Sequence, residues 1–181
     1  HDQVGNRILG DRLGHGIAFE TQKLVAAAVM LSPSIPLIFM GEEYGETAPF
    51  QYFVSHGDPE LVAAVRKGRR EEFAAFHLDG EAPDPQAVET LQKSKLNWEQ
   101  RHVGQHQQLW RFYQTLLRLR RELPALRNSE RQNLEASVIH PGLLLKLRRW
   151  HEDAQVLCLL NFSQQPSSAI IPAPALHATQ T

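Results

Sequence analysis

The spacing of hydrophobic residues changes near Pro124, and this change constrains the fold more than any other feature of the sequence. Before Pro124, apolar residues recur at helical spacing, most regularly over residues 105–123. After it, three short apolar or alternating runs are separated by turn residues, over 134–140, 143–150 and 156–162. A period of about 3.6 residues predicts amphipathic helices, and a period of about two predicts strands. We therefore expect a helical part and a small set of hairpin-linked antiparallel strands, with a boundary at residues 125–133.

The first half of the chain follows the order helix, proline break, apolar run. The spacing predicts a helix over residues 19–31, and Ser32-Pro33 ends it because the residue before a proline leaves the helical region. Residues 35–41 are apolar on both faces, which is typical of a strand in a parallel sheet covered by helices. This order predicts an α/β fold.

Further segments extend this pattern. Asp58-Pro59-Glu60 predicts a helix start, with an N-cap, a first-turn proline and an acid at the positive end of the dipole, and the helix is expected to reach Phe76. Residues 1–16 and 78–103 are expected to form loops, the second with short turns. Residues 167–171 are a candidate fourth strand, and the tail over 172–181 is expected to fray.

Charge and cysteine content exclude several classes of protein. Lys and Arg number 19 and Asp and Glu number 20, so the net charge of -1 predicts no nucleic-acid partner and no anionic membrane partner. The longest apolar stretch, near residues 24–31, is too short to span a bilayer. The single cysteine, Cys158, excludes an intrachain disulfide and a metal site with several thiolates. These features favour a reducing, cytoplasmic compartment.

Two polar loops carry the residues with the clearest potential for chemistry. In the first, an ionised Asp2 could stabilise a developing cation and His1 could hydrogen-bond a sugar hydroxyl. In the second, Glu42 and Glu43 follow the predicted strand directly. The C-terminal ends of strands form the catalytic face of a (β/α)8 barrel. The structural alternative is that one acid caps a turn and the other is solvated.

Aromatic and histidine side chains suggest two further sites. Phe50, Tyr52 and Phe53 lie on a polar loop, where aromatic rings either stack on sugar rings or anchor the loop. His102 and His106 have the spacing of two metal ligands on one helical face. Because no third ligand is evident, we interpret this pair as the start of a helix.

The motifs have a joint explanation in one superfamily. The segment His1-Asp2-Gln3-Val4-Gly5-Asn6-Arg7 resembles the fourth signature region of the α-amylase superfamily of glycoside hydrolases, and Ile35 to Tyr44 resembles its eighth barrel strand. Within it, four further segments look like those of the malto-oligosyltrehalose trehalohydrolase family: residues 10–13, 48–53, 66–73 and 83–98. The resemblance is specific over residues 1–125. The remainder resembles the family only as the type of C-terminal β domain that is usual there.

This resemblance implies a fold and an activity. Residues 1–125 would form the C-terminal portion of a (β/α)8 TIM barrel, and residues 126–181 a small antiparallel β-sandwich domain that we expect to be truncated as well. The family cleaves the α-1,4 bond next to the terminal trehalose of maltooligosyltrehalose by a retaining mechanism, in which a carboxylate nucleophile forms a glycosyl-enzyme. That reaction needs no cofactor and no metal.

The resemblance also implies roles for residues. Asp2 would be the carboxylate that stabilises the transition state, and His1 a ligand of the sugar at the cleaved bond. The other substrate-binding residues would be Gln3, Arg7, Glu42, Glu43, Tyr44, Phe50, Tyr52 and Phe53. The family's nucleophile Asp and general-acid Glu lie on earlier barrel strands, upstream of His1. We therefore expect a C-terminal fragment that is inactive alone and has two partners: the rest of the same polypeptide, and maltooligosyltrehalose or another α-glucan.

Three alternatives stay open. Another α-glucan enzyme, such as a glycogen branching enzyme, would share the His-Asp and Gly-Glu elements. A non-catalytic glucan-binding module would use the aromatic residues to hold sugar without cleaving it. The start at His1 would also fit a processed mature chain.

Overall fold

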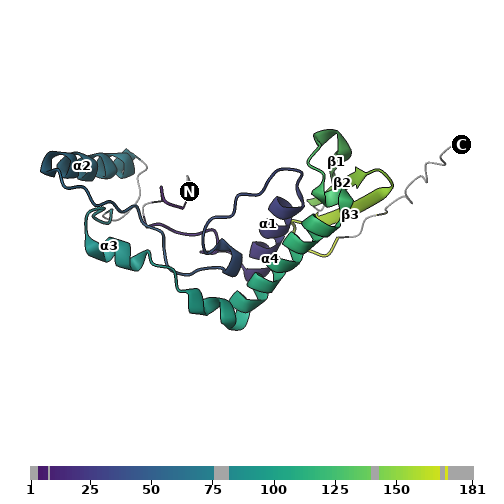
Figure 1. Ribbon diagram of the computed structural model, residues 1–181, viewed down its shortest axis with the longest axis horizontal. Helices are drawn as coiled ribbons and strands as arrows, with labels where there is room; N and C mark the ends of the chain where they lie inside the picture. Colours follow the sequence, from purple (N-terminus) through teal and green to yellow (C-terminus); the bar gives the residue numbers. More distant parts are fainter. Residues whose placement is uncertain (1–3, 8, 76–81, 140–142, 168–169, 171–181) are drawn as a thin grey trace, which may run out of the picture. The chain divides into compact units, whose positions relative to one another are not determined.

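The computed structural model describes the chain except for residues 1–3, 8, 76–81, 140–142, 168–169 and 171–181 (Figure 1). It divides into two compact units. The first comprises residues 1–30 and 36–118, and the second comprises residues 31–35 and 119–181. The predicted tail over 172–181 and most of the candidate strand over 167–171 lie outside the described residues.

The first unit is built from helices and loops. Its helical elements are α1 (Phe19–Leu31), η1 (Glu42–Tyr44), α2 (Pro59–Ala75), α3 (Val88–Lys93), η2 (Trp98–His102) and α4 (Gly104–Glu122), with the ends of α1 and α4 assigned to the second unit. The predicted helices over 19–31 and 105–123 are confirmed. The helix that was predicted from Asp58 is confirmed as α2, and Asp58 Oδ1 accepts hydrogen bonds from Glu60 N at 2.8 Å and Leu61 N at 3.4 Å.

Helices α1 and α4 supply most of the buried apolar side chains in this unit. The buried residues are Ala26, Ala27 and Met30 on α1 and Leu109, Tyr113 and Leu116 on α4. The ammonium group of Lys23 lies 5.8 Å from the centre of the Phe112 ring, so the two helices are neighbours. An amphipathic helix gains its stability from such packing more than from helix propensity.

Residues 82–103 are more ordered than the sequence predicted. They contain the six-residue helix α3 and the 3-10 helix η2, where the sequence predicted a loop with short turns. The Asn97 side chain accepts a hydrogen bond from Glu99 N at 3.3 Å and so caps η2. Thr90 Oγ1 donates to the Asp84 carbonyl at 2.6 Å, which ties α3 to the preceding loop.

The prediction of a buried strand over residues 35–41 is wrong for this chain. These residues form no strand, and Ile35 and Leu37 expose 88% and 85% of their surface. A parallel strand needs a neighbouring strand on at least one edge to satisfy its backbone groups. Among the described residues, no segment pairs with residues 35–39, so they lack the ladder that would define a strand.

The second unit contains a three-stranded antiparallel sheet, which confirms the predicted hairpin-linked strands. Its elements are α5 (Pro124–Arg127), η3 (Arg131–Asn133), β1 (Leu134–Ile139), β2 (Leu144–His151) and β3 (Ala154–Asn161), with the strands in the order β1-β2-β3. A second sheet, as in a sandwich, is absent from the part of the chain that is described. The sandwich therefore stays a prediction.

One face of this sheet is packed. Leu147 of β2 pairs with Cys158 of β3, and both side chains are buried. Helix α5 contacts both strands and buries Ala125 and Leu126. Arg149, also on β2, is only 1% exposed, so the buried layer includes a cation as well as apolar side chains.

Candidate functional site

The site residues predicted from the opening motif are only partly described. His1, Asp2 and Gln3 lie outside the described residues. Arg7 is exposed, and its carbonyl accepts a hydrogen bond from Gly10 N at 3.0 Å. This bond closes a turn that leads the chain from the motif into residues 10–14.

Residues 40–48, called the acidic loop below, contain two glycines in left-handed backbone conformations. Gly41 has φ 87° and Gly45 has φ 68°, and they flank the 3-10 turn η1 that contains Glu42 and Glu43. A Cβ at position 41 would lie 2.7 Å from the Cβ of Glu46, so a side chain would require the loop to move. Glycine at this position therefore permits both the turn and its tight closure.

Both carboxylate oxygens of Glu42 accept hydrogen bonds from the protein. Oε2 accepts from Phe39 N at 3.2 Å, and Oε1 accepts from the Tyr113 hydroxyl at 2.9 Å. Burial, reinforced by the adjacent Glu42 carboxylate, raises the pKa of Tyr113, which keeps its hydroxyl protonated as a donor. Glu42 thus connects the acidic loop to helix α4.

Glu43 and Tyr44 occupy different environments. Glu43 is half-buried and, with Glu42, lines an open groove whose walls are mainly apolar side chains such as Val25, Trp110 and Leu117. Tyr44 is 0% exposed, and its hydroxyl donates to Glu46 Oε2 at 2.8 Å. Of the predicted substrate residues on η1, Glu43 therefore lines an open surface and Tyr44 lies in the core.

The three aromatic residues of the next segment also divide into two groups. The Phe50 ring lies 5.0 Å from the Phe39 ring and 5.7 Å from the Phe53 ring, so Phe50 and Phe53 anchor the loop through edge-to-face contacts. Tyr52 is 39% exposed, and the guanidinium carbon of Arg69 lies 4.6 Å from its ring centre. Tyr52 is the one of the three with a substantially exposed ring.

A buried polar network next to this loop was not found from the sequence. The Glu46 carboxylate is 4% exposed, and it accepts hydrogen bonds from Tyr44, from Ala48 N at 2.8 Å and from Asn97 N at 2.6 Å. Burial opposes its ionisation, but these donors outweigh that effect and hold the pKa of Glu46 below its usual range. The one signal in the sequence was the close spacing of Gly41 and Gly45, which favours a tight turn just before Glu46.

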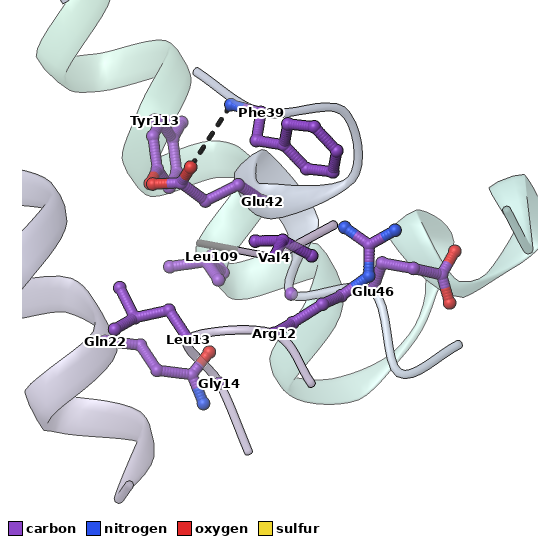
Figure 2. A pocket seen from close by; sticks show the side chains of 11 residues that line it. Val4, Arg12, Leu13, Gly14, Gln22, Phe39, Glu42, Glu46, Leu109 and Tyr113 are labelled. Carbon is purple, nitrogen blue, oxygen red and sulfur yellow. Dashed lines mark hydrogen bonds between the residues drawn. The ribbon is translucent and has the colours of Figure 1, made fainter. Parts of the chain in front are cut away.

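A small pocket lies between the acidic loop, residues 12–14 and helix α4. Figure 2 shows Glu42 near Tyr113 and Phe39 at one side of this pocket and Arg12 beside Glu46 at another. The pocket is therefore lined by polar groups on two sides and by apolar side chains, including Val4 and Leu109, between them.

The two histidines with metal-like spacing do not share a site. His106 Nδ1 lies 2.9 Å from the Tyr44 carbonyl, and His102 Nε2 accepts a hydrogen bond from Arg101 at 3.1 Å. The structure confirms the preferred interpretation, because α4 begins between them at Gly104. Among the described residues, no group of three or more His, Cys, Asp or Glu side chains could hold a metal ion. The helices described are also too short or too polar to cross a membrane.

Comparisons with known proteins relate nearly the whole chain to one group of enzymes. No protein-family model matches the chain. It is 40% identical over 177 residues to the malto-oligosyltrehalose trehalohydrolase of Rhizobium sp. (strain M-11), which covers 97% of this chain and 29% of that protein. It is 43% identical over 166 residues to the enzyme of the same name from Deinococcus radiodurans, covering 91% of this chain and 27% of that protein.

A solved structure supports the same relationship. A crystal structure from Salmonella typhimurium, described provisionally as an alpha amylase, matches with a TM-score of 0.75 and 39% sequence identity. The match covers 93% of this chain and 30% of that one. The chain therefore spans less than a third of the length of the relatives that it matches.

Proposed function

Because this chain is a relative of the malto-oligosyltrehalose trehalohydrolases, as its motifs led us to expect, we propose that it forms part of a retaining glycosidase that releases trehalose. The bond cleaved would be the α-1,4 bond next to the terminal trehalose of maltooligosyltrehalose. The observation that carries this proposal is the 40% identity to an enzyme of that name across 97% of the chain. We propose the cytoplasm as its compartment.

In this proposal Asp2 supplies one of three carboxylates. A nucleophilic Asp attacks the anomeric carbon, and a Glu protonates the leaving oxygen; both would come from the rest of the polypeptide. Asp2 would bind ring hydroxyls more tightly as positive charge develops on the sugar, which favours the transition state over the bound substrate. His1, Gln3 and Arg7 would contact the same sugar.

The loop over residues 42–53 would contact the leaving trehalose. Glu43 lines an open groove and Tyr52 exposes part of its ring, so these two side chains are suited to direct contact with sugar. The Glu42 carboxylate accepts a hydrogen bond from Tyr113, and the Tyr44 hydroxyl donates one to Glu46. Glu42 and Tyr44 would therefore act by holding the loop in place. Phe50 and Phe53, with Phe39, would anchor it.

The exposed apolar run supports a place in a larger barrel. Ile35, Leu37 and Met40 expose 88%, 85% and 50% of their surface, although the run has the composition of a buried parallel strand. We propose that strands from the rest of the polypeptide pair with residues 35–40 and that residues 1–125 are the last part of a (β/α)8 barrel. Residues 126–181 would follow as a β domain.

Product analysis of the complete polypeptide tests this function. With maltooligosyltrehalose as substrate, we expect free trehalose from the complete polypeptide and none from the 181-residue chain alone. Asp2→Asn should lower kcat by at least about a hundredfold, as loss of transition-state electrostatics does in other enzymes. Asp58→Asn is the matched control, because asparagine caps a helix as well as aspartate does.

The other outcomes identify the alternatives. New branch points in α-glucan, without free trehalose, would indicate a branching enzyme. Calorimetric binding of maltooligosaccharides by the complete polypeptide, without cleavage, would indicate a glucan-binding module.

A further inference from the structure

Arg12 is a buried cation that bonds to both ends of the acidic loop. Its side chain is 5% exposed; Nε donates to the Ala48 carbonyl at 2.6 Å, and Nη1 donates to the Met40 carbonyl at 2.7 Å. One guanidinium plane therefore fixes the separation of residues 40 and 48. Glu42 and Glu43 lie on the turn between them.

The neighbouring Gly10 extends this attachment to the aromatic segment. Phe50 N donates to the Gly10 carbonyl at 2.8 Å. Gly10 has φ 70°, and a Cβ there would lie 2.4 Å from the Phe50 carbonyl carbon. Residues 10–12 thus contact the backbone at Met40, Ala48 and Phe50, immediately after the motif that carries Asp2.

The guanidinium is held at an energetic cost. Burial lowers the pKa of Arg12, and Nη2 is buried without a hydrogen-bond partner among the described residues. The carboxylate of Glu46 opposes the effect of burial, since it favours the charged form of Arg12. A buried polar atom without a partner calls for an explanation beyond stability. The planar fork of arginine offers one, because it holds donors on two separate nitrogens in a fixed geometry, whereas lysine carries all its donors on one nitrogen.

We propose that Arg12 is a positioning residue that sets the acidic loop and the aromatic segment for the leaving group of the substrate. Arg12 touches no sugar itself; it acts through the loop that presents Glu43 and, beyond Phe50, Tyr52. Its effect is specificity: it favours substrates that end in trehalose over plain maltooligosaccharides of the same length. The specificity part of this inference rests on the proposed function, whereas the attachment of the loop does not.

Hydrogen exchange on the complete polypeptide tests the attachment. In Arg12→Met, we expect the amides of Glu46, Ala48 and Phe50 to exchange at least about tenfold faster than in the wild type, since their protection depends on local opening of the loop. The amide of Val62, bonded to the Asp58 carbonyl in α2, is the internal reference and should be unchanged. Unchanged exchange at all three loop amides would overturn the proposal.

A conservative variant covers the case in which Arg12→Met unfolds. Arg12→Lys keeps the charge but places all its donors on one nitrogen and loses the fixed fork, so the same three amides should accelerate to a smaller extent. If they do not, the arginine fork is not what holds the loop. Arg111→Met, on an exposed position of α4, is the matched control and should behave as wild type.

Kinetics of the complete polypeptide test the specificity. Arg12→Met should lower kcat/KM for maltooligosyltrehalose about tenfold more than for a maltooligosaccharide of equal length, mainly through KM, because the lost contacts would be made to bound substrate. An equal loss on both substrates would show a merely structural role and overturn the proposal. Failure of the wild type to release trehalose would instead refute the proposed function, and the exchange experiment would still decide the attachment.

Discussion

The carboxylate of Glu46 is almost enclosed by protein, yet its pKa lies below the usual range. The donors responsible come from three places in the sequence: Tyr44, Ala48 and Asn97. A buried charge is tolerated when it is fully hydrogen-bonded, and its removal leaves several donors unsatisfied. At the scale of single residues, this cluster ties the acidic loop to Asn97 through one carboxylate.

The titration of Glu46 gives a pH-dependent prediction. Its pKa is lower in the folded chain than the unfolded value of about 4.3. The stabilisation from its ionised form is therefore present above about pH 4.3 and is lost as the pH falls toward the folded pKa. Glu46→Gln should lower the free energy of unfolding by about 2 kcal/mol at pH 7. Urea titrations from pH 3 to pH 7 measure this difference, and a difference that stays constant with pH would contradict the assignment.

At the scale of elements, one arginine joins strand β2 to residues 31, 32 and 128 of the same unit. Arg149 Nη1 donates to the carbonyls of Leu31 at 3.0 Å and Ser32 at 2.9 Å, and Nη2 donates to the Asn128 carbonyl. The last carbonyls of a helix have no intrahelical partner, so a cation there satisfies them and complements the helix dipole. Arg148 and Arg149 are adjacent on β2 and face different surroundings, because successive side chains of a strand point to opposite faces.

This difference predicts unequal effects of the same substitution at adjacent positions. Arg149→Met should lower the free energy of unfolding by about 3 kcal/mol, since it removes the Arg149 donors from the part-buried carbonyls of Leu31 and Asn128, whereas the Ser32 carbonyl keeps its bond from Arg120. Arg148→Met should cost less than about 1 kcal/mol, because Arg148 makes partly exposed contacts with Glu135 and Gln155. Chemical denaturation of both variants measures the two values. Equal losses would show that the bonds of Arg149 contribute little beyond surface pairing.

At the scale of the whole molecule, the most unusual feature is the exposed apolar run over residues 35–40. Leu37 and Met40 are largely exposed and line an open groove with mainly apolar walls. Large exposed apolar surfaces and unpaired extended backbone mark interfaces and promote association. In the isolated chain, nothing among the described residues covers this surface.

We therefore expect the 181-residue chain to self-associate at micromolar concentration. Leu37→Lys should shift its sedimentation toward the monomer, because a charge on this run disfavours burial against another copy. Val88→Lys is the control, since Val88 is also exposed (64%) but lies on α3, away from the run. A wild-type chain that sediments as a single monomeric species would contradict this prediction.

Local patterns in the sequence determined most of the helices and all three strands. The Asp58 cap, the amphipathic period over residues 105–123 and the alternation after Pro124 each depend on neighbours within a few residues, so they could be predicted without the fold. The motif around Asp2 also indicated the family. The roles of the predicted site residues stay predictions.

Only the tertiary structure decided the state of residues 35–41 and the networks around Glu46 and Arg12. A strand depends on a partner that may come from anywhere in the sequence, and the apolar pattern of residues 35–41 could not report whether that partner was present. The bonds of Arg12 to Met40 and Ala48 join residues that lie 28 and 36 positions apart. Contacts of this range leave no periodic signal, because they arise from how the chain folds back on itself.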